Sequence, residues 1–140
     1  MPYFNYIMGK SFSLKNWMQA ARPKTLTAAY TPVIIGASLA YLQDSLNLLV
    51  SLIALLCATL IQIGTNFAND YYDYKKGSDR ADRVGFKRMT AAGLIEPDTM
   101  KLAAFVTMFL AFLSGLYLVN VGGVTILAIG ISSLVFGIMY

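Results

Sequence analysis

Four long apolar runs dominate the pattern of this 140-residue chain, and short polar connections separate them. A helix that spans a bilayer needs about 17–25 predominantly apolar residues, so each run is long enough for one span. A helical bundle in a soluble protein would interrupt such runs with charged positions, and these runs contain none. The sequence therefore predicts four transmembrane helices, at residues 26–42, 46–68, 102–121 and 124–140.

The charges lie at one side of these spans. The chain is 57% hydrophobic and 13% charged, whereas a soluble domain is about 25% charged. All eleven Lys and Arg residues fall in residues 1–25 or 69–101, which share one side of a four-span alternation. The positive-inside rule predicts that this side is cytoplasmic. The net charge of +4 is thereby explained by membrane topology, and no nucleic-acid partner is expected.

Residue types that are absent exclude several kinds of chemistry. The chain has no histidine and a single cysteine, Cys57, inside an apolar run. Histidine general bases, Ser-His-Asp triads, histidine metal ligands and an intrachain disulfide are therefore excluded. Any bound metal must be held by oxygen, which favours Mg²⁺ or Ca²⁺ over Zn²⁺.

Local signals place two helix starts. Residues 11–21 predict a short interfacial helix, with Ser13 as its cap and Trp17 at the level of the lipid headgroups. In the third span, Pro97 occupies a plausible first helical position and Asp98 its first turn.

A polar stripe is expected along the second span. On a continuous helix over residues 59–73, six polar side chains fall within about 60° of one line, and they are Thr59, Gln62, Asn66, Asn69, Asp70 and Asp73. Polar side chains in hydrocarbon face a bundle interior or a watery cavity, so this stripe predicts a functional site. Two neighbouring carboxylates repel each other, and a divalent cation would relieve that repulsion, with Asn66 or Asn69 as a neutral ligand.

Basic residues follow the stripe. Arg80, Arg83, Lys87 and Arg88 stand close to Asp79 and Asp82. Cations beside a Mg²⁺ site suit a ligand that carries phosphate, and a flexible break at Gly77 would let Asp79 fold back toward the stripe. The alternative is an ordinary solvated loop with weak surface ion pairs.

Three segments carry a resemblance to a known family. "NDYYDYKKGSD", residues 69–79, resembles the first aspartate-rich motif of the UbiA superfamily of intramembrane aromatic prenyltransferases. Residues 21–40 and 81–95 are similar to the corresponding segments of the 1,4-dihydroxy-2-naphthoate polyprenyltransferases, the menaquinone branch of that superfamily. The resemblance extends from about Trp17 to the last residue.

The resemblance implies an all-α, polytopic membrane bundle of about nine helices. This chain would contribute a cytoplasmic segment, residues 1–25, and four spans of a single domain, residues 26–140. A second aspartate-rich motif would belong to a missing C-terminal half, so the chain alone is not expected to be active. The resemblance also places the protein in the inner membrane of a bacterial cell.

The same resemblance implies roles for individual residues. Mg²⁺ would be held by Asn69, Asp70, Asp73 and Asp79, and the three acids of this set would be catalytic. Gly77 stands where the superfamily usually has its third acid, and Asp79, two residues later, follows the naphthoate branch. The diphosphate would be bound by Arg83, Lys87 and Arg88, and substrate by Lys24 and Asn66. Lys24 is equally explained as an interface lysine that extends to the headgroups.

The function implied is Mg²⁺-dependent transfer of a polyprenyl group from an allylic diphosphate to 1,4-dihydroxy-2-naphthoate, giving demethylmenaquinone. Another acceptor remains open: a benzoate, homogentisate, chlorophyllide or haem. A CDP-alcohol phosphotransferase is disfavoured because its DG-x2-AR signature is missing. A transporter or channel with an ion site in the stripe is a further alternative, although such a site should lie near the membrane midplane.

Overall fold

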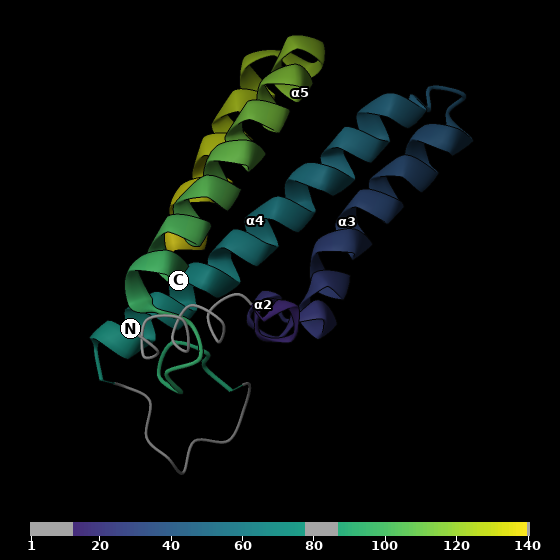
Figure 1. Ribbon diagram of the computed structural model, residues 1–140. Coiled ribbons are helices and arrows are strands. Elements are labelled where there is room, and N and C mark those ends of the chain that lie inside the picture. Colours follow the sequence, from purple (N-terminus) through teal and green to yellow (C-terminus); the bar gives the residue numbers. More distant parts are fainter. Residues whose placement is uncertain (1–12, 78–86, 140) are drawn as a thin grey trace.

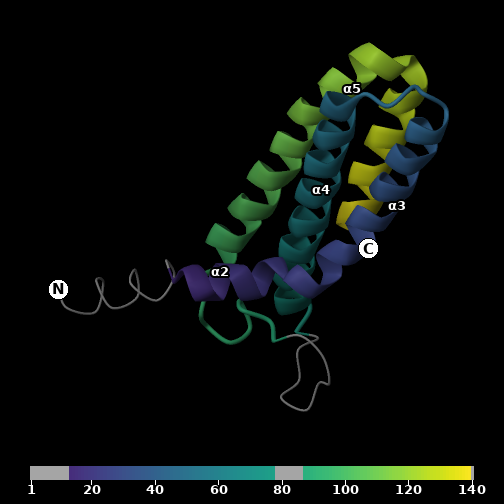
Figure 2. The same ribbon diagram turned by 90° about the vertical axis from the view of Figure 1, so that its right-hand side faces the viewer.

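Helices are the only regular secondary structure in the described part of the protein. A computed structural model describes residues 13–77 and 87–139. These residues contain no strand and form α2 (Leu14–Ala21), α3 (Pro23–Leu42), α4 (Leu48–Lys75) and α5 (Pro97–Met139). Helix α4 packs against both α3 and α5, while α2 lies across one end of the long helices (Figures 1 and 2). The predicted all-α bundle is confirmed.

A sharp junction joins the short helix α2 to α3. The backbone carbonyl of Ser13 accepts hydrogen bonds from the N–H groups of Asn16 and Trp17, at 2.9 and 3.2 Å, but the Ser13 side chain forms no cap bond. At the other end of α2, Arg22 adopts a left-handed conformation with φ 51°. Pro23 then begins α3, and a proline disfavours helical geometry in the residue before it. The chain therefore turns at Arg22, and α2 lies across the bundle end (Figure 2).

Helix α4 carries the polar stripe on one unbroken element. It begins after Asn47, whose Oδ1 accepts a hydrogen bond of 3.2 Å from the N–H of Val50. The helix continues past the predicted span, through the acidic motif, to Lys75. The helical setting assumed for residues 59–73 is therefore confirmed, and the acids lie at the polar end of the span.

Helix α5 contains the third and fourth apolar runs together. Its 43 residues are interrupted at Gly123, whose φ of 71° and ψ of −162° are not helical and belong to a region open essentially to glycine alone. The chain reverses near this residue, and the two arms of α5 run in opposite directions along α4 (Figures 1 and 2). Within the described residues, three helices are long and apolar enough to cross a membrane. The third and fourth predicted runs are the two arms of α5, because the reversal at Gly123 lies between residues 102–121 and 124–140.

The buried core lies at the polar end of the bundle. Trp17 on α2 meets Phe67 on α4 edge to face, with ring centroids 5.4 Å apart. The buried residues of this cluster are Ala20, Phe67, Ala68, Met89, Ile95, Met100 and Ala104. Because Met89 and Ile95 belong to the segment between α4 and α5, the core anchors that segment against α4.

The long helices expose large apolar side chains along their outer faces. Phe105 and Phe136 are each 68% exposed, and Leu39 is 55% exposed. A soluble monomer rarely exposes apolar surface on this scale, whereas lipid-facing helices require it. Together with the three long apolar helices, this surface identifies the chain as an integral membrane protein.

Candidate functional site

Asp70 is fully buried and binds backbone amides. Its side chain is 0% exposed, although it belongs to the acidic motif at the end of α4. Its Oδ2 accepts a hydrogen bond from the N–H of Met89, and its Oδ1 accepts one from the N–H of Thr90, both at 2.9 Å. A buried carboxylate needs such partners because leaving water is costly for a charge. The sequence predicted a metal for these oxygens, and the structure gives them these two amides.

The segment that supplies these amides is a compact turn. The carbonyl of Met89 accepts hydrogen bonds from the N–H groups of Leu94 and Ile95, at 2.9 and 3.2 Å. The carbonyl of Arg88 accepts one of 3.1 Å from the N–H of Ala92. Met89 is 0% and Ile95 1% exposed, so both side chains are anchored in the core. Residues 88–95 are thereby held as a unit against α4.

Asp73 and Arg88 form an ion pair at the same end of α4. The Nη2 of Arg88 donates a hydrogen bond to the Oδ2 of Asp73. The Arg88 side chain is 10% exposed and that of Asp73 is 25% exposed, so this carboxylate, unlike that of Asp70, reaches the surface. The structure thus brings together one acid predicted to bind metal and one cation predicted to bind diphosphate.

Asn66 connects α4 to the α2–α3 junction. It is 3% exposed, and its Nδ2 donates hydrogen bonds to the carbonyl of Ala21 at 2.8 Å and to Oγ1 of Thr25 at 3.0 Å. The stripe was expected to face the bundle interior, and at Asn66 it does. Because the amide hydrogens are used in these contacts, the side chain holds α3 and α2 against α4.

The other predicted residues lie apart from these contacts or outside the described ranges. Asn69 is partly buried, one helical turn before Asp73, whereas Lys24 and Lys87 are exposed. Asp79 and Arg83 lie outside the described residues. Within the described ranges, no three Cys, Asp or Glu side chains gather as a cation site. The structure therefore assembles Asp70, Asp73 and Arg88, with Asn69 beside them on α4.

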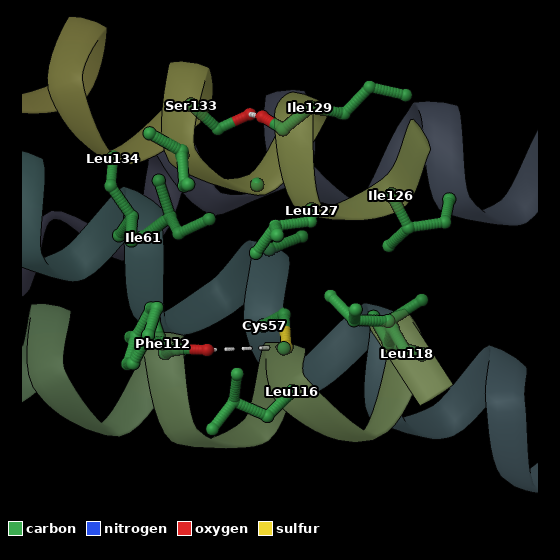
Figure 3. A pocket seen from close by; sticks show the side chains of 17 residues that line it. Cys57, Ile61, Phe112, Leu116, Leu118, Ile126, Leu127, Ile129, Ser133 and Leu134 are labelled. Carbon is green, nitrogen blue, oxygen red and sulfur yellow. Dashed lines mark hydrogen bonds between the residues drawn. The ribbon is translucent and has the colours of Figure 1, made fainter. Parts of the chain in front are cut away.

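An apolar pocket lies farther along α4, away from the charged residues. It has a volume of about 260 Å³ and lies between α4 and the two arms of α5 (Figure 3). Cys57 donates a weak hydrogen bond from its Sγ to the carbonyl of Ala111, at 3.7 Å, beside this pocket. Leu116, Ile126 and Leu134 are among the apolar side chains that line it. The lining carries no charge, so the polar chemistry belongs to the other end of α4.

Residues 29–140 match the UbiA prenyltransferase family. The chain belongs to that family. The family resemblance inferred from the three sequence segments is therefore confirmed, and α3, α4 and α5 of this UbiA-family chain all lie within or overlap the matched region.

Two of the relatives below share the name 1,4-dihydroxy-2-naphthoate octaprenyltransferase, and the third is named after the UbiA prenyltransferase domain. The chain is 47% identical over 105 residues to 1,4-dihydroxy-2-naphthoate octaprenyltransferase of Escherichia coli, covering 75% of this chain and 34% of that protein. It is 38% identical over 110 residues to the protein of the same name from Haemophilus influenzae. This match covers 77% of this chain and 36% of that protein. It is 39% identical over 64 residues to UbiA prenyltransferase domain-containing protein 1 of Danio rerio, covering 45% and 19%. No solved structure matches this UbiA-family chain.

The match to these relatives covers only part of their length. It spans about a third of the length of the curated relatives from Escherichia coli and Haemophilus influenzae. The resemblance had implied that the complete domain is longer than these 140 residues, and this coverage is consistent with that expectation.

Sequence reasoning missed two features of the site. Arg22, a buried cation at the α2–α3 junction, is 8% exposed, and its carbonyl accepts hydrogen bonds from the N–H and Oγ1 of Thr25, both at 2.9 Å. An arginine directly before Pro23 was an available signal, because such a position favours a turn over a helix. The second feature is that Asp70 accepts hydrogen bonds from the backbone amides of Met89 and Thr90. Because backbone amides are the same at every residue except proline, no pattern of side chains could have predicted this contact.

Proposed function

We propose that this chain forms part of an intramembrane enzyme that transfers a polyprenyl group from an allylic diphosphate to 1,4-dihydroxy-2-naphthoate, giving demethylmenaquinone in its reduced, hydroquinone form together with CO₂ and diphosphate. One structural observation supports it: Asp73 and Arg88 meet where the apolar span of α4 ends. The choice of acceptor is supported by the names of the relatives in Escherichia coli and Haemophilus influenzae.

The distribution of charge along α4 suits such a donor. A polyprenyl diphosphate has a long hydrocarbon tail and an anionic head, so it needs an apolar wall that leads to cations. The part of α4 before Asn66 is mostly apolar and carries no charge, while Arg88 and the exposed Lys87 lie at its other end. Arginine can bind phosphate oxygens through two parallel hydrogen bonds. Arg83, outside the described residues, would add a third cation.

The oxygen ligands at this end fit Mg²⁺. Asp73 offers a partly exposed carboxylate, and Asn69 an amide oxygen one helical turn away. Mg²⁺ commonly uses only one or two protein carboxylates and completes its shell with water and substrate phosphate. Asp79 would supply a second carboxylate. The bound ion would offset the negative charge of the diphosphate head.

The residues of this chain would assist the departure of diphosphate. As the bond between the allylic carbon and oxygen breaks, the electron pair leaves with the diphosphate, and the Arg88 guanidinium stabilises the charge that accumulates there. A carbon of the electron-rich naphthoate ring then attacks the allylic cation. The carboxylate leaves as CO₂, the electron pair of its bond restores the aromatic ring, and the product is a hydroquinone. Apolar walls such as those of α4 exclude water, which would otherwise trap the cation.

Topology follows from the distribution of charge. We place the polar end of α4 and the segment 1–25 in the cytoplasm of a bacterial cell, with the long helices in the inner membrane. The basis is that all eleven Lys and Arg residues lie on this side. The diphosphate donor would then enter from the inner leaflet.

A direct assay tests the proposed function. The longest reading frame that contains these residues, here called the full-length protein, is expressed in membranes lacking the endogenous activity. Labelled allylic diphosphate is supplied with 1,4-dihydroxy-2-naphthoate, with or without EDTA. We expect labelled product in the presence of Mg²⁺ and its loss with EDTA. The hydroquinone is oxidised by air during extraction and is recovered as demethylmenaquinone.

Parallel incubations distinguish the alternatives. Benzoate, homogentisate, chlorophyllide and haem are supplied one at a time in place of the naphthoate. If one of these acceptors becomes labelled and the naphthoate does not, the proposed acceptor is overturned. If the donor is consumed with none of the acceptors, the naphthoate included, the proposed reaction class is overturned and a transporter is favoured.

A further inference from the structure

The buried position of Asp70 is not explained by the chemistry above. Asp70 and Asp73 are three residues apart on α4, yet the first is 0% exposed and the second 25% exposed at its side chain. Both oxygens of Asp70 accept hydrogen bonds from consecutive amides, those of Met89 and Thr90. A ligand that must reach substrate-bound Mg²⁺ would need an accessible oxygen. The described geometry instead directs Asp70 to the backbone.

The position of those amides in the chain matters. They belong to the two residues that directly follow Arg88, so a carboxylate that fixes them also fixes the backbone from which the Arg88 side chain extends. That side chain reaches back to Asp73, which neighbours Asp70 on the same helical face. The segment 88–90 is thus attached to α4 at two adjacent points, one through its backbone and one through its guanidinium.

We propose that Asp70 is a positioning residue: its carboxylate clamps the Met89 and Thr90 amides and thereby holds Arg88 beside Asp73, where a diphosphate would bind. This proposal rests on the proposed function, because it assigns Arg88 to a diphosphate. It departs from the expectation that Asp70 is a metal ligand. A free arginine on a loop would lose side-chain and backbone freedom on binding, and the clamp removes part of that loss beforehand.

Hydrogen exchange tests the clamp independently of any reaction. The purified protein in lipid nanodiscs is compared with Asp70→Asn, since an asparagine amide can accept at one oxygen and presents hydrogens to the other N–H group. We expect exchange at Met89 and Thr90 to accelerate about tenfold or more. The matched control is Asp98→Asn, an exposed acid in the first turn of α5, which should leave these amides unchanged. Unchanged exchange in Asp70→Asn would overturn the clamp.

Kinetics of the full-length protein then separates positioning from metal binding. We expect Asp70→Asn to raise the KM for the allylic diphosphate about tenfold, while the Mg²⁺ concentration for half-maximal rate stays that of the unaltered protein. In an Arg88→Gln background, Asp70→Asn should raise KM no further, because both changes act through the same guanidinium. An additive effect, or a large rise in the Mg²⁺ requirement, would show that Asp70 is a metal ligand and overturn the proposal.

A second variant covers the case in which Asp70→Asn does not fold. Thr90→Pro removes one donor of the clamp and leaves the Asp70 carboxylate intact. It should also raise the KM for the donor without changing the Mg²⁺ requirement, and an unchanged KM would argue against the clamp. Failure of the proposed function is separate: a protein that transfers no prenyl group but shows accelerated exchange in Asp70→Asn retains the clamp and loses only the assigned ligand.

Discussion

The guanidinium of Arg88 pairs with the carboxylate of Asp73, 15 residues earlier in the chain, at the point where the apolar part of α4 has given way to its acidic end. In this arrangement the acid proposed for the metal and the cation proposed for the diphosphate neutralise each other. Binding of a Mg²⁺-diphosphate would supply each with a new partner of opposite charge. The pair is therefore the central feature of the proposed site.

Asp73→Asn in the full-length protein should reduce turnover by about 10²-fold or more, the scale seen when one electrostatic group of a reaction centre is removed. The reason is that asparagine keeps the shape of the side chain but loses the charge that would bind the cation. Turnover is measured with labelled donor in isolated membranes, and the amount of inserted protein is measured in the same samples. Near-normal turnover would remove Asp73 from the metal site.

Asn66→Ala should destabilise the fold by about 1–3 kcal/mol, because it removes both hydrogen bonds that connect α4 to Ala21 and Thr25. Thermal unfolding in detergent provides the measurement. Asn120→Ala is the matched control, since Asn120 is exposed on α5. Equal midpoints for the two variants would contradict a structural role for the Asn66 amide.

Gly123→Ala should cost about 1–3 kcal/mol, because a side chain at φ 71° and ψ −162° is strained. The loss would be read from the same unfolding assay. Gly130→Ala serves as the comparison: Gly130 lies within the second arm of α5, and an added Cβ there would meet nothing within 4 Å, so that variant should be neutral or slightly stabilising. A harmless Gly123→Ala would mean that the reversal tolerates an ordinary residue.

Single cysteines introduced in a Cys57→Ala background should report the topology. Ser45 follows α3 and Lys87 directly precedes the turn at residues 88–95, and both residues are exposed. In intact spheroplasts, a membrane-impermeant maleimide should label Ser45→Cys and reach Lys87→Cys only after permeabilisation. The reverse pattern would invert the orientation, and labelling of both from outside would contradict a single crossing by α4.

Several features of the fold were predictable because they depend on local properties. The length and hydropathy of the apolar runs indicated membrane helices, and Pro97 and Asp98 marked where α5 begins. The reversal between the last two runs occurs at the predicted boundary, residues 122–123, but hydropathy alone could not show that a single glycine makes the turn. Gly123 shows its role only through its backbone angles.

For the candidate site, the helical period correctly placed Asn66 toward the bundle interior and Asp70 beside Asp73 on α4. It could not distinguish the two acids, although one is buried and the other reaches the surface. Their difference depends on the turn at residues 88–95, which packs over Asp70 and leaves part of Asp73 uncovered.

The sequence alone determined that the protein belongs in a membrane, that the acidic motif is helical and lies at the end of a span, and which family it resembles. These properties were predictable because hydropathy and helical periodicity depend on neighbouring residues. The packed structure was needed to show which groups meet: Asp70 with amides 19 and 20 residues away, and Asn66 with a carbonyl 45 residues away. A helical wheel states which face a side chain occupies. What lies opposite that face depends on how the helices and the intervening turn pack together.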